Sequence, residues 1–226
     1  MQTIAILSQK GGTGKTTLAL HLAVAAEKNG DVVVVIDLDP QASAAGWKDS
    51  RNAETPAVVA APPTRLPQLL EAAKGGGAQL ILIDTAPHSG DASLAAAELA
   101  DMILIPCRPA ILDLRAIATT ARIAKLAEKP AFVVLNAVPP SATHILNDAG
   151  EAVKVHGLKT VPVTLHQRAA YAHALTLGQT AQEYEPGSKA ADEVTHLYRW
   201  LKKEFAALPN CQIAGNTAPL QKGRTL

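Results

Sequence analysis

A glycine- and lysine-rich segment near the amino terminus holds the residues best suited to chemistry. Residues 10–17 read Lys-Gly-Gly-Thr-Gly-Lys-Thr-Thr, and glycines at this spacing allow positive φ angles and close backbone approach. The backbone N–H groups of such a loop converge on an anion, and a helix that starts there adds the positive end of its dipole. We expect Lys15 to reach the β- and γ-phosphates of a nucleotide and the Thr16 hydroxyl to hold Mg²⁺. The predicted phosphate-binding residues are Gly11, Gly12, Thr13, Gly14, Lys15, Thr16 and Thr17.

Acidic residues end two apolar runs further along the chain. The run at 32–37 ends in Asp37, with Asp39 two residues later, and the run at 80–84 ends in Asp84. Nucleotide hydrolysis needs a metal ion and an oriented water, and carboxylates serve both purposes. Asp84 would hold the metal through its water shell, and one acid of the first pair would orient the water. Each acid could instead cap the helix that follows its strand. The candidate metal ligands are Thr16, Asp37 and Asp84.

The elements that must position these side chains alternate between strand and helix. Continuous apolar runs are typical of parallel strands covered on both faces, and ligands bind such sheets at the carboxyl ends of the strands. We therefore predict an α/β fold, a single-domain P-loop NTPase with a mostly parallel twisted sheet and helices on both faces. The predicted strands are 3–7, 32–37, 57–61, 80–84, 102–106, 131–136 and 160–163. The predicted helices are 18–26, 42–48, 66–74, 91–99, 111–126, 146–155, 167–175 and 188–208.

Length and composition agree with one large domain that has its own core. The chain has 226 residues, 48% of them apolar, and a net charge of +1, so any surface for nucleic acid must be local. No signal peptide is evident at 1–25, and no apolar run approaches the roughly 20 residues of a membrane span, which predicts a cytoplasmic protein. We expect residues 1–208 to form the domain. Residues 209–226 lack periodicity and are predicted to be a flexible tail.

The loop departs from the ordinary phosphate-binding pattern in an informative way. Gln9 stands where the standard motif has its first glycine, and a second lysine, Lys10, stands beside the glycine pair. The loop resembles the deviant Walker A motif of the ParA/MinD family of ATPases, especially the short plasmid-type ParA proteins. The resemblance covers nearly the whole chain. Its further blocks are residues 37–41 (Asp-Leu-Asp-Pro-Gln), 83–87 (Ile-Asp-Thr-Ala-Pro), 134–136 (Val-Leu-Asn), 168–171 (Arg-Ala-Ala-Tyr) and 183–186 (Glu-Tyr-Glu-Pro).

The resemblance implies roles for several residues of the site. In the family the extra lysine, here Lys10, reaches across a dimer interface to the nucleotide of the partner. The second acid of the Asp-x-Asp motif, Asp39, would orient the attacking water, so the implied catalytic residues are Lys10, Lys15 and Asp39. Asn136 would read the adenine edge, and the backbone after residues 161–163, with Pro162 as the named residue, would complete the adenine pocket. The implied cofactors are ATP and Mg²⁺.

The resemblance also implies a function in DNA segregation for plasmids or chromosomes. Such a protein forms a homodimer with ATP, binds duplex DNA without sequence preference, associates with the nucleoid, and hydrolyses ATP when a ParB-type adaptor binds. Basic side chains of the C-terminal third would contact DNA phosphates. Acids on the same helix, Asp192, Glu193 and Glu204, could instead make this an ordinary solvated face. The candidate DNA-binding residues are Arg168, Lys189, Arg199, Lys202 and Lys203.

Two other functions use the same loop. A MinD-like positioning ATPase needs a C-terminal amphipathic helix for the membrane surface. Residues 210–219 contain Gly and Pro and have no apolar stripe, so we predict no membrane partner. A metabolic ATP-dependent synthetase, such as one for biotin or cobyrinate, remains the other alternative, and retention on DNA of arbitrary sequence in the presence of ATP would distinguish it.

Overall fold

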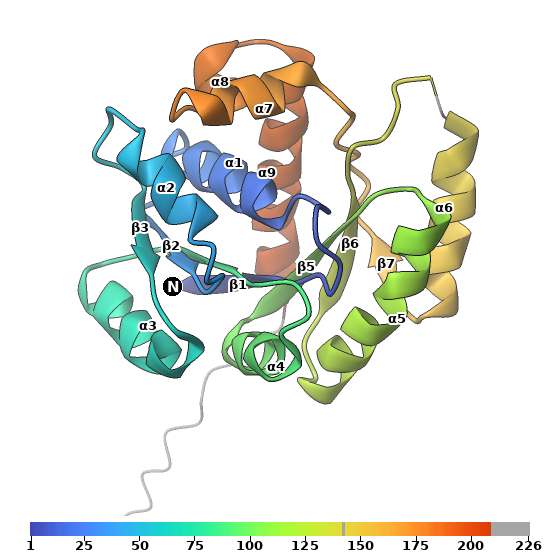
Figure 1. The fold of residues 1–226 in the computed structure, drawn as a ribbon, viewed down its shortest axis with the longest axis horizontal. Helices are drawn as coiled ribbons and strands as arrows, with labels where there is room; N and C mark the ends of the chain where they lie inside the picture. Colours follow the sequence, from blue (N-terminus) through green and yellow to red (C-terminus); the bar gives the residue numbers. More distant parts are fainter. Residues whose placement is uncertain (142, 209–226) are drawn as a thin grey trace, which may run out of the picture.

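A seven-stranded sheet forms the centre of the protein (Figure 1). In this computed structural model, which describes residues 1–141 and 143–208, the strand order is β3-β2-β4-β1-β5-β6-β7, and every pairing is parallel. The predicted α/β fold with a parallel sheet is therefore confirmed. The strands are β1 (Gln2–Ile6), β2 (Val33–Asp37), β3 (Ala57–Ala60), β4 (Leu80–Asp84), β5 (Met102–Cys107), β6 (Ala131–Leu135) and β7 (Lys159–Thr160).

Helices cover both faces of this sheet. One face is packed by α1 and α9, and the other by α3, α4, α5 and α6 (Figure 1). The helices are α1 (Lys15–Glu27), α2 (Ser43–Asp49), α3 (Leu66–Gly75), α4 (Gly90–Leu99), α5 (Ile111–Leu126), α6 (Thr143–Val155), α7 (Ala169–Thr176), α8 (Ala181–Tyr184) and α9 (Lys189–Ala207), with a short 3₁₀ turn at Pro63–Arg65.

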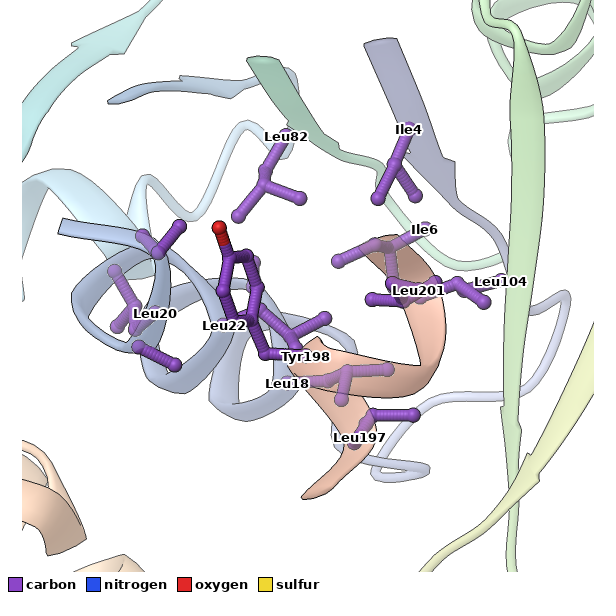
Figure 2. Close-up of a cluster of buried hydrophobic side chains, with 14 of the residues drawn as sticks. Ile4, Ile6, Leu18, Leu20, Leu22, Leu82, Leu104, Leu197, Tyr198 and Leu201 are labelled. Atoms are coloured by element: carbon purple, nitrogen blue, oxygen red, sulfur yellow. The ribbon is translucent and has the colours of Figure 1, made fainter. Parts of the chain in front are cut away.

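The two layers arise from the alternation of side chains along the buried strands. In β1, Ile4 and Ile6 face α1 and α9, whereas Ala5 belongs to the core on the opposite face. Figure 2 shows Ile4 and Ile6 in the same cluster as Leu22 of α1 and Leu201 of α9. These four side chains are at most 2% exposed, and burying each contributes about 1.5–3 kcal/mol. The continuous apolar runs of the sequence are thus explained by two buried faces.

The topology creates a switch point at the carboxyl ends of the central strands. β1 lies between β4 and β5. After β1 the chain builds β2, β3 and β4 on one side of it, and then β5, β6 and β7 on the other side. A crevice at such a switch point, outside the carboxyl ends of the strands, is where open α/β sheets bind ligands. The lysine-rich loop follows β1 directly at this point.

Several details of the predicted elements change. The first helix begins at Lys15, inside the predicted loop, and not at residue 18. The last strand is limited to Lys159–Thr160, because Pro162 has no N–H to continue the ladder. The short helix α8 was not predicted; it is stabilised by a capping box between Thr180 and Glu183. The predicted tail, 209–226, lies outside the described residues. Within the part of the chain that is described, no helix is long and apolar enough to span a membrane.

Candidate functional site

The loop between β1 and α1 has the backbone geometry of an anion cradle. Gly12 and Gly14 adopt φ angles of 72° and 93°, and α1 begins at the next residue, Lys15. A Cβ atom at Gly14 would lie only 2.3 Å from Nδ2 of Asn136. The positive φ favours glycine at position 14, and any side chain there would also have to displace the amide of Asn136.

Asn136, predicted to read adenine, braces this loop from the end of β6. Its Nδ2 donates to the carbonyl oxygen of Thr13 at 2.7 Å, and its Oδ1 accepts from the N–H of Ala137 at 2.8 Å. The side chain joins two segments more than a hundred residues apart in sequence. Asn136 also lines the pocket beside the loop, so base recognition stays a prediction, but loop support is the role visible in the structure.

The side chains that follow the loop converge on Asp84 at the end of β4. The Thr16 hydroxyl donates to Oδ2 of Asp84 at 2.6 Å, and Lys15 is buried nearby. Burial lowers the pKa of Lys15, while the charges of Asp84 and Asp39 oppose that shift. Oδ1 of Asp84 is buried and makes no hydrogen bond to any described residue. A carboxylate oxygen left in this state is costly unless a cation meets it, and hydroxyl and carboxylate oxygens are ligands that Mg²⁺ accepts.

The pKa of the Asp84 carboxyl is shifted well above that of an ordinary aspartate. Burial raises the pKa of its carboxyl to about 7, and the neighbouring acids Asp37 and Asp39 act in the same direction. The Thr16 hydrogen bond and the charge of Lys15 act the other way. Burial therefore works against the ionised form that a metal requires, and a bound cation would stabilise that form. Thr16 and Asp84 fit the predicted magnesium site.

The two acids after β2 have different surroundings. Oδ2 of Asp37 accepts from the N–H of Ala44 at 2.9 Å in the first turn of α2, and its Oδ1 accepts from the N–H of Asp39 at 3.0 Å. Asp37 thus has the capping role that the sequence left open, and its role as a metal ligand stays a prediction. Asp39 is half-buried and accepts from the N–H of Gln41, so its prediction as the water-orienting acid stands untested.

Lys10, predicted to act across a dimer, forms an ion pair within its own chain. Its Nζ contacts Oδ1 of Asp113 in the first turn of α5, and Arg108 Nε donates to Oδ2 of the same carboxylate at 2.5 Å. Burial alone would raise the pKa of Asp113, but the hydrogen bonds from Arg108 and Lys10 lower it. Asp113 was not among the predicted residues. The sequence feature that could have indicated it is an acid in the first turn of a helix that follows a strand.

A pocket of about 230 Å³ opens beside the loop, on the side of Asn136. Thr17 and His21 of α1 form one wall, and the segment 165–168 with Tyr171 forms the other. Burial lowers the pKa of His21 to about 4, so its ring is neutral. Pro162 is exposed and is not among the residues that line the pocket, whereas residues 165–168 further along the chain are, so the adenine wall stays a prediction.

Glu193 of α9 holds this second wall in place. The sequence analysis considered it only as one of the acids that could make the helix an ordinary solvated face. Its carboxylate accepts from the backbone and ring of His166, from Arg168 at 2.6 Å, and from the Tyr171 hydroxyl at 3.0 Å. Charge-assisted bonds of this kind are about twice as strong as neutral ones. Arg168, predicted to bind DNA, pairs with Glu193 beside the pocket, and its contact with DNA stays a prediction.

The remaining predicted DNA-binding residues lie on α9, along its solvent-facing side. Lys189, His196, Arg199 and Lys203 recur at helical spacing, so they form one exposed line that we call the α9 stripe; Asp192 lies within it. Among the described residues, Lys189, Arg199 and Lys203 make no ion pair. Lys202 lies beside the stripe and pairs with Asp31 at 3.2 Å.

This fold and site define a P-loop nucleotide-binding protein, and comparison with known proteins gives its family. The family model described as the CobQ/CobB/MinD/ParA nucleotide binding domain matches residues 4–180. The chain belongs to this family, which confirms the resemblance seen in the sequence. Its similarity to "Maintenance of carboxysome distribution protein A" from Gloeobacter kilaueensis is 31% identity, covering 90% of this chain and 94% of the relative. The chromosome-partitioning ATPase Soj of Thermus thermophilus is 26% identical, over 92% of this chain and 96% of Soj.

Solved structures agree on the fold. The Pyrococcus horikoshii MinD structure with Mg-ADP superimposes with a TM-score of 0.71 and 20% identity, covering 92% of this chain and 99% of MinD. A Cyanothece McdA–ATP complex gives a TM-score of 0.70 and 18% identity, covering 89% of this chain and 96% of McdA. The structures of these relatives therefore hold nucleotide, in one case with magnesium, on the same fold.

Proposed function

We propose that this protein is a ParA-type ATPase that binds ATP and Mg²⁺, dimerises, and then binds duplex DNA without sequence preference. The observation that carries the proposal is the combination of the two-lysine loop with the exposed α9 stripe. A metabolic synthetase would need the loop but would have no use for an exposed line of cations. Similarity to Soj and to the carboxysome distribution protein supports a role in positioning or segregating a cargo.

The residues of the loop divide the work of hydrolysis. Bound Mg²⁺·ATP supplies the phosphoryl group and the metal that neutralises its charge. Lys15 and the loop amides hold the phosphates, and Thr16 with Asp84 provides the oxygens for the metal. Asp39 orients water from its half-buried position. Lys10 leaves Asp113 to reach the nucleotide of the second subunit, so the ion pair exchanges one anionic partner for another.

DNA binding follows from the number of cations brought to one surface. A single stripe offers few contacts to phosphates, and a dimer offers twice as many on a rigid body. Because each neutralised phosphate releases counterions, the dimer should bind more tightly and with a steeper dependence on salt. An adaptor of the ParB type would trigger hydrolysis and return the protein to the weakly binding monomer. The cargo is then a DNA molecule or a protein assembly attached to that adaptor.

A salt-titrated binding isotherm on duplex DNA of arbitrary sequence tests this proposal. We expect tight binding with ATP, weak binding with ADP, and at least tenfold weaker binding for Arg199→Glu combined with Lys203→Glu. The matched control is Lys28→Glu combined with Lys74→Glu, which makes the same change of charge at exposed positions outside the stripe. ATP affinity should be equal in all three proteins. Equal DNA affinity with ATP and with ADP would favour the metabolic alternative. An equal loss of DNA affinity in both double variants would favour it as well.

A further inference from the structure

A second concave surface lies at the amino ends of the strands, whereas the nucleotide site lies at their carboxyl ends. It is an open groove of about 850 Å³, formed by the C-terminal half of α5, the amino ends of β6 and β7, and the turn that joins α6 to β7. The phosphate loop follows the carboxyl end of β1, so an occupant of this groove would not reach the nucleotide. Nothing in the proposed ATPase cycle uses the groove.

The rim of the groove is strongly basic. Arg122, Lys125, Lys129 and Lys159 line it, against the single carboxylate of Glu128. None of these four cations forms an ion pair with a described residue. Lys202, by comparison, pairs with Asp31 on another part of the surface. A concave surface with one sign of charge concentrates anions of the other sign.

Small and apolar side chains, including Ala118 and Ala121, also line the groove. Ala118, Ala121, Arg122 and Lys125 lie on one side of α5, because they are spaced by three and four residues. The two alanines leave the helix surface uncovered by any large side chain, which lets another helix approach closely. Next to groove residues along the chain, Leu126 and Val155 are 70% and 82% exposed.

We infer that this groove is the docking site for an acidic amphipathic helix of a partner protein. The four cations would pair with carboxylates along the edges of that helix, and its apolar side would rest on Ala118 and Ala121. The charge arrangement selects an anionic partner, and the alanine floor selects one with an apolar face. A nucleic acid backbone would satisfy the cations but would leave the floor without a contact. The helix-in-groove mode is a common way to bind a short segment of a partner.

The groove also has a place in the assembly. It lies on the side of the sheet packed by α5 and α6, whereas the α9 stripe lies beyond the other face. A partner segment could therefore bind while the nucleotide edge faces a second subunit and the stripe faces DNA. The protein would then carry three ligands on three separate surfaces.

Fluorescence anisotropy with a labelled synthetic peptide tests the inference. The probe is a helix of about 18 residues with leucines along one side and glutamates elsewhere. One control peptide has the same composition but its leucines are scattered around the helix. The other keeps the leucines along one side and has lysines in place of the glutamates. The protein variants are Arg122→Glu with Lys125→Glu, which reverses the rim, and Ala121→Phe, which fills the floor without changing charge. Lys28→Glu with Lys74→Glu is the matched control for charge.

The expected result is saturable binding of the acidic amphipathic peptide to the wild type and to the control variant. Both groove variants should bind it at least tenfold more weakly while binding ATP like the wild type. No binding to the wild type, equal binding of the scattered peptide, or equal binding by the groove variants would overturn the inference. Duplex DNA that displaces the peptide, and loses the same affinity when the rim is reversed, would assign the groove to nucleic acid instead.

Discussion

The nucleotide edge of the sheet and the α9 stripe both depend on charged side chains, yet they hold them in opposite ways. At the edge, Lys15 lies buried beside Asp84, and Lys10 is paired with Asp113. On the stripe, cations such as Arg199 are exposed and unpaired among the described residues. A buried charge without a partner destabilises the folded protein by roughly several kcal/mol, whereas an exposed unpaired charge has almost no effect on stability. The edge is therefore preorganised by its own residues, and the stripe is left available to an external polyanion.

Lys15→Ala should break the edge with the largest effect. Removing the cation that holds the phosphates should weaken ATP binding by at least about a hundredfold, since charge-assisted bonds contribute roughly 1.5–3 kcal/mol each. DNA binding in the presence of ATP should disappear with it, although the stripe is intact. A nucleotide titration by calorimetry measures the first effect. Equal ATP affinity in the variant and the wild type would refute the assignment of Lys15.

Asp84→Asn should show how burial has tuned the edge. Burial raises the pKa of Asp84 to about 7 from 3.8, so the folded protein keeps this proton to a higher pH than the unfolded chain does. The stability from this group is complete below about pH 4 and is lost as the pH rises through 7. The variant should therefore be more stable than the wild type at pH 8 without Mg²⁺, by about 1–3 kcal/mol.

The same substitution separates metal binding from stability. In the wild type, Mg²⁺ affinity in the presence of nucleotide should fall as the pH drops through 7, because protons compete for Asp84. In the variant, Mg²⁺ should bind about ten- to a hundredfold more weakly at pH 8 and with no such pH dependence. Thermal melts and Mg²⁺ titrations at pH 6 and 8 provide both readouts. An unchanged pH profile would place the metal elsewhere.

Glu193→Gln tests the point where the two regions meet. Glu193 comes from the helix of the stripe but holds Arg168 and Tyr171 against the nucleotide pocket. Loss of its charge should weaken ATP binding about tenfold and reduce discrimination between ATP and GTP, because the wall of the pocket becomes mobile. Glu204→Gln on the same helix is the matched control. If ATP and GTP affinities fall equally, Glu193 only stabilises the fold.

Asp113→Asn should give the smallest and most specific effect. Without the carboxylate, Lys10 is no longer held in its own subunit, so ATP-dependent dimer formation should rise a few-fold, about 1 kcal/mol. Asp91→Asn, another acid in the first turn of a helix, is the control. Lys10→Ala should instead bind ATP normally and fail to dimerise. Analytical ultracentrifugation with ATP distinguishes these outcomes, and a dimer weakened by Asp113→Asn would show that the ion pair supports the active state.

The sequence alone was sufficient for the loop, the strand ends and the order of the elements. Lys15, Thr16 and Asp84 could be predicted because each stands in a short contiguous pattern whose backbone conformation and burial follow from neighbouring residues. Alternating apolar runs and helical segments similarly determine a parallel sheet, and with it the edge where the motifs converge. The predicted helix over 188–208 was confirmed for the same local reason: α9 begins at Lys189, and Ser188 caps it by accepting from the N–H of Ala191.

Only the tertiary structure decided which charged and polar groups are free and which are engaged. The hydrogen bonds of Arg168 to Glu193 and of Asn136 to Thr13 join residues far apart in the chain, which only the fold brings within hydrogen-bond distance. Several acids and bases compete for each such contact, and their types and spacing are equally compatible with many pairings. The choice among them is made by the packing of helices on the sheet, because burial makes every unpaired charge or amide costly.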